Sequence, residues 1–332
     1  MNNRAISDIS LTYVITTRNK LPYLKEVMKR LLENVRVDEE IVVADGVSTD
    51  GTVEYLKDLH EQSKIHQFIS EPDKGEAHGY NKALLMARGE LIKLITDDDA
   101  FYYPGIQECK RFMLENKHID VISGNTAQIM LERPGRFKFL AECQNNYQEW
   151  LNHSTSGWFI GLPLMIRKQS LSLTGLFSTG FIQVDTEYSL RITSLNHVNI
   201  AWHMSVLAVR IENPKSNFRS FSLDRKSFEE RDRMWYFFSQ SYRNNLIAQT
   251  KKEFSLLEFL KKQARPLKIN VETLLNRGEN KKNENQLERN EILVEACLNS
   301  LSEIENAFST CDNFFEEFNS KDEPVILYKR TA

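Results

Sequence analysis

Residues 91–105 read LIKLITDDDAFYYPG and give the clearest indication of the fold. The short apolar run Leu91–Ile95 is typical of a buried strand. Three consecutive aspartates, Asp97 to Asp99, follow it, and the next predicted helix is Pro104–Asn116. A buried strand, a polar strand end and a helix in this order are typical of α/β proteins.

The same order recurs through the first 125 residues. Short β-branched, apolar runs alternate with segments of helical spacing, which is typical of right-handed βαβ units. The predicted strands are Leu11–Thr16, Ile41–Ala44, Gln67–Ser70, Leu91–Ile95 and Ile119–Ser123. The predicted helices are Tyr23–Glu33, Val53–Glu61, His78–Ala87 and Pro104–Asn116. We therefore predict an α/β fold with a mostly parallel sheet flanked by helices.

The chain changes character after residue 125. Residues 126–213 are mixed, with predicted strands Gly161–Ile166 and Val206–Ile211 and a predicted helix Thr186–Ser194. After Pro214 glycine almost disappears, and residues 224–318 are predicted to be helical. The helices expected there are Phe228–Leu246, Glu253–Gln263 and Asn290–Phe308.

Composition excludes several classes of protein. The 332 residues are 41% hydrophobic, enough for a real core, and carry 43 Lys+Arg against 46 Asp+Glu, a net charge of −3. This balance argues against a dedicated nucleic-acid binder. No apolar run approaches the roughly 18 residues that span a bilayer. Without a secretory signal or paired cysteines, a reduced cytoplasmic protein is expected.

Polar clusters follow each of the first four predicted strands. They are Thr16–Asn19, Asp45–Thr52, Glu71–Gly75 and Thr96–Asp99. Ligands of open parallel sheets bind beyond the carboxyl ends of the strands, so these clusters are predicted to share one ligand-binding edge.

The aspartate triplet is the sharpest of these features. Adjacent carboxylates repel one another unless a cation lies among them, and Mg²⁺ or Mn²⁺ takes oxygen ligands while leaving positions for phosphate oxygens. The alternative is a solvated acidic turn that caps the following helix. The chain has no GxGxxG after the first strand and no GxxxxGK[ST], which argues against dinucleotide redox enzymes and P-loop NTPases.

Three runs together resemble family-2 glycosyltransferases of the GT-A fold, bacterial surface-polysaccharide enzymes above all. They are YVITTRNK at 13–20, VVADGVSTDGT at 42–52 and SEPDKGEAHGYNKALLMARGELIKLITDDDAFYYPG at 70–105. The resemblance implies a GT-A catalytic domain over residues 1–218, with a nucleotide-binding half (1–125) and an acceptor-binding half (126–218). Residues 219–332 are then a helical C-terminal region.

The resemblance also implies residue roles in donor binding. Asp45 holds the place of the aspartate that contacts the base or ribose, and Thr16 lies against the base. Lys74 approaches the nucleotide or its diphosphate, and Arg18 is a further nucleotide-binding candidate. Many members have a second aspartate where this chain has Gly46, so the resemblance leaves the identity of the nucleotide base open. UDP is taken as the expected nucleotide because it is common in the family.

Within the triplet, the resemblance implies that Asp99 and Asp97 bind Mn²⁺ or Mg²⁺ and that Asp97 and Asp98 contribute to nucleotide binding. The family motif has two aspartates, so the triplet can be aligned with it in two registers that differ by one residue. Asp99 is favoured as the direct metal ligand. His203 is a weaker candidate for an additional metal ligand.

A second family signature is matched around Asp185, which the resemblance implies is the general base. Gly175-Leu176-Phe177 precedes it, and Arg191 follows at the family spacing, although Val184 replaces a usual acid. The alternatives are that Asp185 only caps a helix beginning at Thr186, or that Glu187 is the base.

These inferences predict an inverting, metal-dependent glycosyltransferase that uses a nucleotide-sugar donor and a glycan or lipid-linked acceptor. The alternative is an inactive GT-A scaffold whose helical tail mediates assembly. Trp158 and Trp202 could form an acceptor platform, or simply pack in the core. The basic amphipathic run 251–262 could contact the inner membrane face, or pack on this domain or on another copy of the chain.

Overall fold

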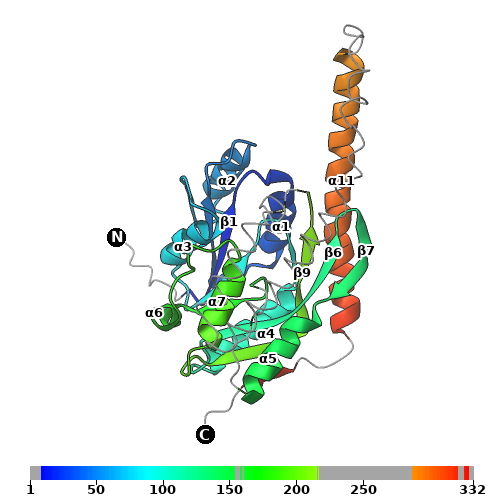
Figure 1. Ribbon diagram of the computed structural model, residues 1–332. Coiled ribbons are helices and arrows are strands. Elements are labelled where there is room, and N and C mark those ends of the chain that lie inside the picture. Colours follow the sequence, from blue (N-terminus) through cyan, green and yellow to red (C-terminus); the bar gives the residue numbers. More distant parts are fainter. Residues whose placement is uncertain are drawn as a thin grey trace, which may run out of the picture. The chain divides into compact units, whose positions relative to one another are not determined.

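The computed structural model describes residues 9–153, 158, 161–214, 216, 286–320 and 325–328 (Figure 1). Contacts divide the chain into one unit formed by residues 1–229 and 301–332 and a second formed by residues 230–300. Only the start of helix α11 is described in the second unit, so the features below belong to the first. Within the described residues, no helix combines the length and apolar character needed to cross a membrane.

The first half of the chain forms the predicted βαβ units (Figure 1). Four neighbouring strands run parallel in the order β4-β1-β2-β3. Their bounds are β1 Leu11–Thr17, β2 Glu39–Asp45, β3 Gln67–Ser70 and β4 Leu91–Ile95. The helices are α1 Leu21–Asn34, α2 Thr52–Glu61, α3 Glu76–Met86 and α4 Tyr103–Glu115. The predicted α/β fold with a mostly parallel sheet is confirmed.

The second half extends the same sheet, whose full order is β10-β9-β6-β8-β4-β1-β2-β3. Strands β6 and β9 are parallel to each other, whereas β8 runs antiparallel to both of its neighbours, so the sheet is mixed. Short β5 pairs with β9, and β7 pairs with β6. The bounds are β5 Ala100–Phe101, β6 Val121–Met130, β7 Arg133–Phe139, β8 Met165–Arg167, β9 Ile200–Glu212 and β10 Ile326–Tyr328.

Several predicted elements in this half differ from the structure. The strand predicted at Gly161–Ile166 is wrong in position, because residues 161–164 form a turn and loop and β8 begins at Met165. The helix predicted at Thr186–Ser194 is α7, which spans Val184–Thr193. The elements not predicted include strands β5, β7 and β10, helix α5 (Ala141–His153), the 3₁₀ turn η1 (Lys168–Ser170) and helix α6 (Leu171–Thr174).

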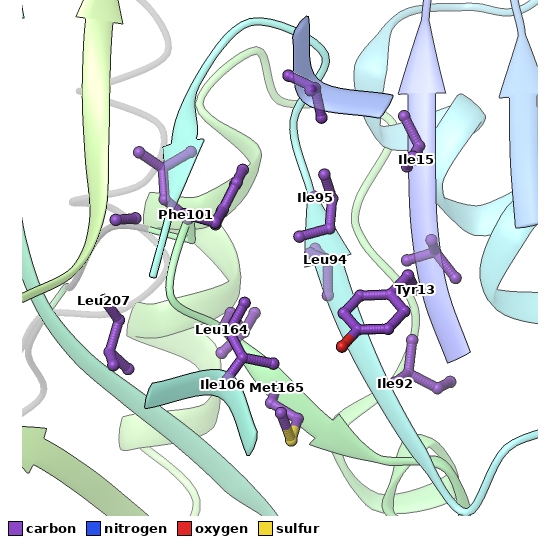
Figure 2. Packing of buried hydrophobic residues seen from close by; sticks show 14 of the residues in the cluster. Tyr13, Ile15, Ile92, Leu94, Ile95, Phe101, Ile106, Leu164, Met165 and Leu207 are labelled. Carbon is purple, nitrogen blue, oxygen red and sulfur yellow. The ribbon is translucent and has the colours of Figure 1, made fainter. Parts of the chain in front are cut away.

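A continuous apolar core lies on the sheet. Figure 2 shows part of this cluster around β1 and β4, including Tyr13, Leu94 and Leu164. All five residues of β4 are buried, as expected for a parallel strand covered on both faces. Burying this apolar surface is the main driving force for the arrangement of the strands.

Lys93 is the charged exception inside this core. Its Nζ is fully buried and donates to the carbonyl oxygens of Leu94 at 2.8 Å and Leu164 at 3.4 Å, and also to that of Leu162. The ammonium also lies 4.8 Å from the ring centre of Phe101. Burial lowers the pKa of Lys93 to about 7. Lys93 therefore fixes the loop 161–164 against the end of β4.

The C-terminal residues pack into the first unit. Helix α11 spans Gln286–Asn319, and its residues Phe308, Cys311 and Phe315 are buried. Phe314 stacks on Phe137 of β7, with ring centres 3.9 Å apart. The predicted helix Asn290–Phe308 lies within α11, whereas Phe228–Leu246, Glu253–Gln263 and the basic run 251–262 lie outside the described residues.

Candidate functional site

The carboxyl ends of the first four strands lie side by side. Thr17 at the end of β1 pairs with Asp45 of β2, and Asp45 pairs with Ser70 of β3. On the other side of β1, Ile15 pairs with Ile95, the last residue of β4. The polar clusters that follow these strands therefore leave the sheet at the same edge.

The aspartate triplet is buried at this edge. Asp97, Asp98 and Asp99 are 6%, 8% and 6% exposed, so the solvated-turn interpretation is wrong. Asp99 is anchored to β9, because its Oδ1 accepts the Ile211 N–H at 2.8 Å. Its Oδ2 accepts the Thr96 hydroxyl at 2.7 Å. Each oxygen of Asp99 keeps a second lone pair for a ligand.

Asp97 and Asp98 share a buried lysine from the β1–α1 junction. Lys20 Nζ lies 2.7 Å from Asp98 Oδ2 and 3.2 Å from Asp97 Oδ1. The same oxygen of Asp98 accepts the Asn213 side-chain amide at 2.9 Å. The β1–α1 junction and the end of β9 therefore converge on the triplet.

The triplet carries more negative charge than Lys20 neutralises. Burial raises the pKa of Asp97 to about 6, although Lys20 opposes the shift. Burial, and then repulsion from Asp98, raises the pKa of Asp99 to about 7. Crowded, buried carboxylates of this kind suit a divalent cation, which in nucleotide sites is held by one or two carboxylates together with phosphate oxygens.

The protein does not supply a complete metal cage by itself. Among the described residues, no three His, Cys, Asp or Glu side chains are grouped to hold a metal ion. His203 is buried and pairs with Glu108, its Nε2 2.8 Å from Glu108 Oε2, while its Nδ1 accepts the Ser205 N–H. The residues present thus fit a cation that takes its remaining ligands from a bound phosphate.

Asp45 organises the loop after β2. Its carboxylate accepts the Ser48 hydroxyl at 2.5 Å, the Ser48 N–H at 3.0 Å and the Ser70 hydroxyl at 2.6 Å. These bonds hold a buried carboxylate, 2% exposed, at the junction of β2 and β3. Asp45 therefore joins the loop after β2 to the end of β3.

The other predicted donor residues surround this edge. Thr16 is buried, and its hydroxyl lies against Gly79 of α3, where a Cβ would overlap it. Arg18 and Lys74 are exposed. Helix α3 can therefore approach the end of β1 only because residue 79 is glycine.

The loops after β2 and β3 touch at Gly46. A Cβ at this position would contact the carboxylate of Asp73 and would lie 3.2 Å from Cδ of Arg18. Asp73 thus lies in the space that a side chain at position 46 would occupy. Asp73 is not among the predicted site residues, because its proximity to Gly46 depends on the fold of two separate loops.

Asp185 lies in the first turn of α7 and is half-buried. Its Oδ1 accepts the Thr186 N–H at 2.8 Å, and its Oδ2 accepts the Gly161 N–H at 3.4 Å. The N-cap interpretation is wrong, because the helix begins at Val184 and its N-cap is Gln183. Asp185 is therefore a helical residue whose carboxylate faces the 161–164 loop.

Glu187, the alternative base, has a different environment. It is buried, and Arg191 binds both of its oxygens, with distances of 2.8 Å from Nε and 3.1 Å from Nη2. Arg191 also donates to the carbonyls of Thr174 and Leu176. Glu187 and Arg191 therefore hold residues 174–176 at the end of α6.

Helix α3 connects the carboxyl end of β4 to the segment that follows α6. Asn81 pairs with the backbone of Phe177 through bonds of 2.8 and 2.9 Å. The neighbouring Tyr80 donates its hydroxyl to the Ile95 carbonyl at 3.2 Å, at the end of β4. The ring of Phe177 contacts Tyr80 and Tyr188, so direct contacts connect the triplet's strand to the helix of Asp185.

The two candidate tryptophans differ. Trp202 is fully buried, stacks on Tyr147 with ring centres 5.1 Å apart and donates to Asn125, so the core-packing interpretation applies. Trp158 is half-buried and packs against the core.

Sequence reasoning missed two residues that contact the triplet. Lys20 directly follows the predicted polar cluster Thr16–Asn19, so its position in the sequence could have identified it as a site residue. Asn213 contacts Asp98 across 115 positions of sequence, and no local pattern marks such a contact.

Together, the sheet order and the carboxylate-lined strand ends define a GT-A fold. Residues 1–349 of S. aureus TarS, solved in complex with UDP-GlcNAc, share this fold with a TM-score of 0.54 and 15% identity, over 79% of this chain and 77% of that one. Residues 12–161 match the family described as Glycosyl transferase family 2.

Curated relatives agree with this assignment. TuaG of Bacillus subtilis strain 168, named as a teichuronic acid biosynthesis glycosyltransferase, is 29% identical over 107 residues, which are 32% of this chain and 42% of TuaG. Chondroitin synthase of Pasteurella multocida strain Pm70 is 26% identical over 103 residues, 31% of this chain and 11% of the synthase. The chain thus spans less than half the length of these relatives.

Proposed function

We propose that this protein is an inverting, metal-dependent glycosyltransferase that moves a sugar from a nucleoside-diphosphate donor to a hydroxyl group of a glycan or lipid-linked acceptor. The observation that carries the proposal is the buried Asp97–Asp99 triplet at the strand ends of a family 2 domain. The proposed catalytic domain is residues 1–218. Its proposed location is the cytoplasm, or the inner membrane face if the acceptor is lipid-linked.

The donor is proposed to lie over the ends of β1 to β4. Asp45 and Thr16 form the base and ribose end, and the exposed cations Arg18 and Lys74 approach the diphosphate. UDP is the proposed carrier, which the UDP-GlcNAc complex of the structurally similar TarS supports. The names of TuaG and chondroitin synthase support a polysaccharide acceptor.

Asp97 and Asp99 are the proposed ligands of a Mn²⁺ or Mg²⁺ ion, and Asp98 is proposed to share the ribose side with Asp97. The bound ion supplies positive charge that stabilises the leaving diphosphate. Anchoring Asp99 to β9 and Thr96 fixes its carboxylate before the ligand arrives, which lowers the cost of reorganisation.

Asp185 is the proposed general base. A carboxylate within reach of the acceptor hydroxyl can accept its proton as the oxygen attacks the anomeric carbon. Two backbone N–H groups orient the Asp185 carboxylate, and its partial exposure leaves it open to a substrate. A single displacement of this kind inverts the configuration at the anomeric carbon.

Turnover of a panel of sugar nucleotides, with and without Mn²⁺, tests this function. We expect Asp185→Asn to lower transfer by about 10²–10⁴-fold, the usual contribution of a general base, while nucleotide affinity stays close to that of the wild type.

Glu187→Gln tests the alternative base with the same acid-to-amide change two residues further along α7. Because this change also weakens the pair with Arg191, the unfolding transition of the variant is measured beside its activity. If Asp185→Asn keeps full activity and Glu187→Gln loses it, Glu187 is the base. If the wild type shows no metal-dependent turnover with any donor, the chain is a scaffold and the proposal is wrong.

A further inference from the structure

Lys20 forms a buried ion cluster with two of the three aspartates. It is 5% exposed, and its Nζ contacts Asp98 at 2.7 Å and Asp97 at 3.2 Å. A buried lysine is costly unless it is paired, and two buried carboxylates are costly without a cation. Lys20 therefore stabilises the arrangement of Asp97 and Asp98 in the ligand-free protein.

The charges of the cluster do not cancel. The three aspartates, each under 10% exposed, carry three negative charges when ionised, and Lys20 supplies one positive charge. Among the described residues, Lys20 is the one cation that forms an ion pair with the triplet. Lys93 of β4 donates instead to backbone carbonyls of Leu94, Leu162 and Leu164. The remaining charge of −2 equals that neutralised by one divalent cation.

The position of Lys20 affects the cation and the diphosphate in opposite ways. Its ammonium repels a divalent cation that approaches Asp97 and Asp98, since like charges in a buried site interact strongly. The same ammonium attracts the negative charge of a nucleoside diphosphate bound at this edge. Lys20 therefore disfavours the metal alone and favours the metal together with the nucleotide.

We propose that Lys20 is the internal counter-ion of the donor site and makes divalent-cation binding dependent on the nucleoside diphosphate. The inference rests on the proposed function and adds an order to it: the metal is held tightly only with the donor. Binding of the two ligands is then coupled, and Lys20 is the positioning residue that sets the coupling.

Titration of the full chain with Mn²⁺, followed by the electron paramagnetic resonance signal of free Mn²⁺, tests this role. For the wild type we expect weak binding of Mn²⁺ alone and much tighter binding with UDP. Lys20→Met keeps the length of the side chain and removes its charge. We expect it to tighten binding of Mn²⁺ alone about tenfold and to reduce the gain from UDP, within the usual size of such couplings.

Two controls separate local charge from other effects. Lys29→Met removes the same charge from an exposed position on α1 and should leave both affinities unchanged. Lys20→Arg keeps the charge and should restore weak binding of Mn²⁺ alone. It also keeps the test open if Lys20→Met fails to fold.

The outcomes are distinct. If Lys20→Met binds Mn²⁺ alone no more tightly than the wild type, or if Lys20→Arg binds Mn²⁺ alone as tightly as we expect of Lys20→Met, the role of Lys20 is rejected while the proposed function stands. If the wild type binds no Mn²⁺ even with UDP, metal dependence itself is rejected, and the role of Lys20 with it.

Discussion

Asp99 shows how a buried carboxylate links the site to stability. Its folded pKa is raised from 3.8 to about 7, chiefly by burial. Between these values the folded state binds more protons than the unfolded state, so stability falls as pH rises. The stabilising contribution of protonated Asp99 is complete below about pH 4 and is lost as pH rises through about 7.

Asp99→Asn should remove this pH dependence. In the metal-free protein, we expect the variant to gain stability relative to the wild type between pH 5 and pH 8, because the amide stays neutral. Urea unfolding at the two pH values, with a chelator present, measures the change. Asp58→Asn, at an exposed position on α2, is the control and should leave the pH dependence of stability unchanged. An equal difference between Asp99→Asn and wild type at both pH values would contradict the account.

Val47 is a strained residue in the loop after β2. Its φ of 60° lies in the left-handed region, which a β-branched side chain rarely adopts, and its side chain is 43% exposed. Asn adopts this region more readily, so we expect Val47→Asn to stabilise the protein by about 1 kcal/mol. Val37→Asn, at a fully exposed position, should change stability by about 0.5 kcal/mol or less. Denaturant unfolding of both variants measures these changes in stability. A Val47→Asn protein that is less stable than the wild type would contradict the proposed backbone strain at Val47.

At the scale of elements, one aspartate supports the starts of two helices. Asp50 Oδ2 accepts the N–H of Leu21, the first residue of α1, at 3.0 Å. Its Oδ1 accepts the N–H of Thr52, the first residue of α2, at 3.2 Å and the Thr52 hydroxyl at 2.6 Å. The loops that carry the donor residues after β1 and β2 are therefore fixed to each other.

Asp50→Ala should weaken both helix starts. Hydrogen bonds to a charged group contribute about 1.5–3 kcal/mol each, and we expect the loss of those that the Asp50 carboxylate accepts to cost about 2 kcal/mol. Asp58→Ala, on the exposed face of α2, should have an effect of about 0.5 kcal/mol or less. The unfolding free energies of the two variants are compared directly. Equal losses of unfolding free energy in both variants would show that the hydrogen bonds to Asp50 do not stabilise the two helix starts.

The accuracy of the sequence-based prediction follows from the physics of each element. Strands β1, β2 and β4 were placed within one or two residues because strands buried on both faces form continuous apolar runs. Strand β7 is mostly exposed and has no such pattern. The strand predicted at 161–166 was displaced because Lys93 binds the carbonyls of Leu162 and Leu164, a contact that no local pattern shows.

The candidate site divides in the same way. The triplet and Asp45 were found because they directly follow predicted strands. Lys20 and Asn213 reach the triplet across 78 and 115 positions of sequence, so only the folded chain brings them together.

At the scale of the whole molecule, the C-terminal residues 301–328 belong to the unit that carries the site. Phe308 is fully buried, and the guanidinium carbon of Arg30 lies 5.0 Å from the centre of its ring. Strand β10 extends the sheet through β9, and the Tyr147 hydroxyl donates to the Leu327 or the Ile200 carbonyl, both within 2.9 Å. The end of the chain therefore contributes to the stability of the domain.

Phe308→Ala measures this contribution. Removing a fully buried phenylalanine should cost about 3–5 kcal/mol in unfolding free energy. Phe318→Ala, on the same helix but 41% exposed, should cost about 1 kcal/mol, the value of an aromatic contact. Chemical denaturation of the full chain compares the two. If the costs are equal and small, helix α11 does not stabilise the domain.

A crystal structure of the protein with Mn²⁺ and UDP tests the central claim most directly. We expect an anomalous manganese peak about 2.0–2.2 Å from carboxylate oxygens of the Asp97–Asp99 triplet, shared with the diphosphate, and the base beside Asp45. A manganese ion and UDP bound elsewhere, with the triplet paired only to Lys20, Asn213 and β9 as in the free protein, would contradict the claim.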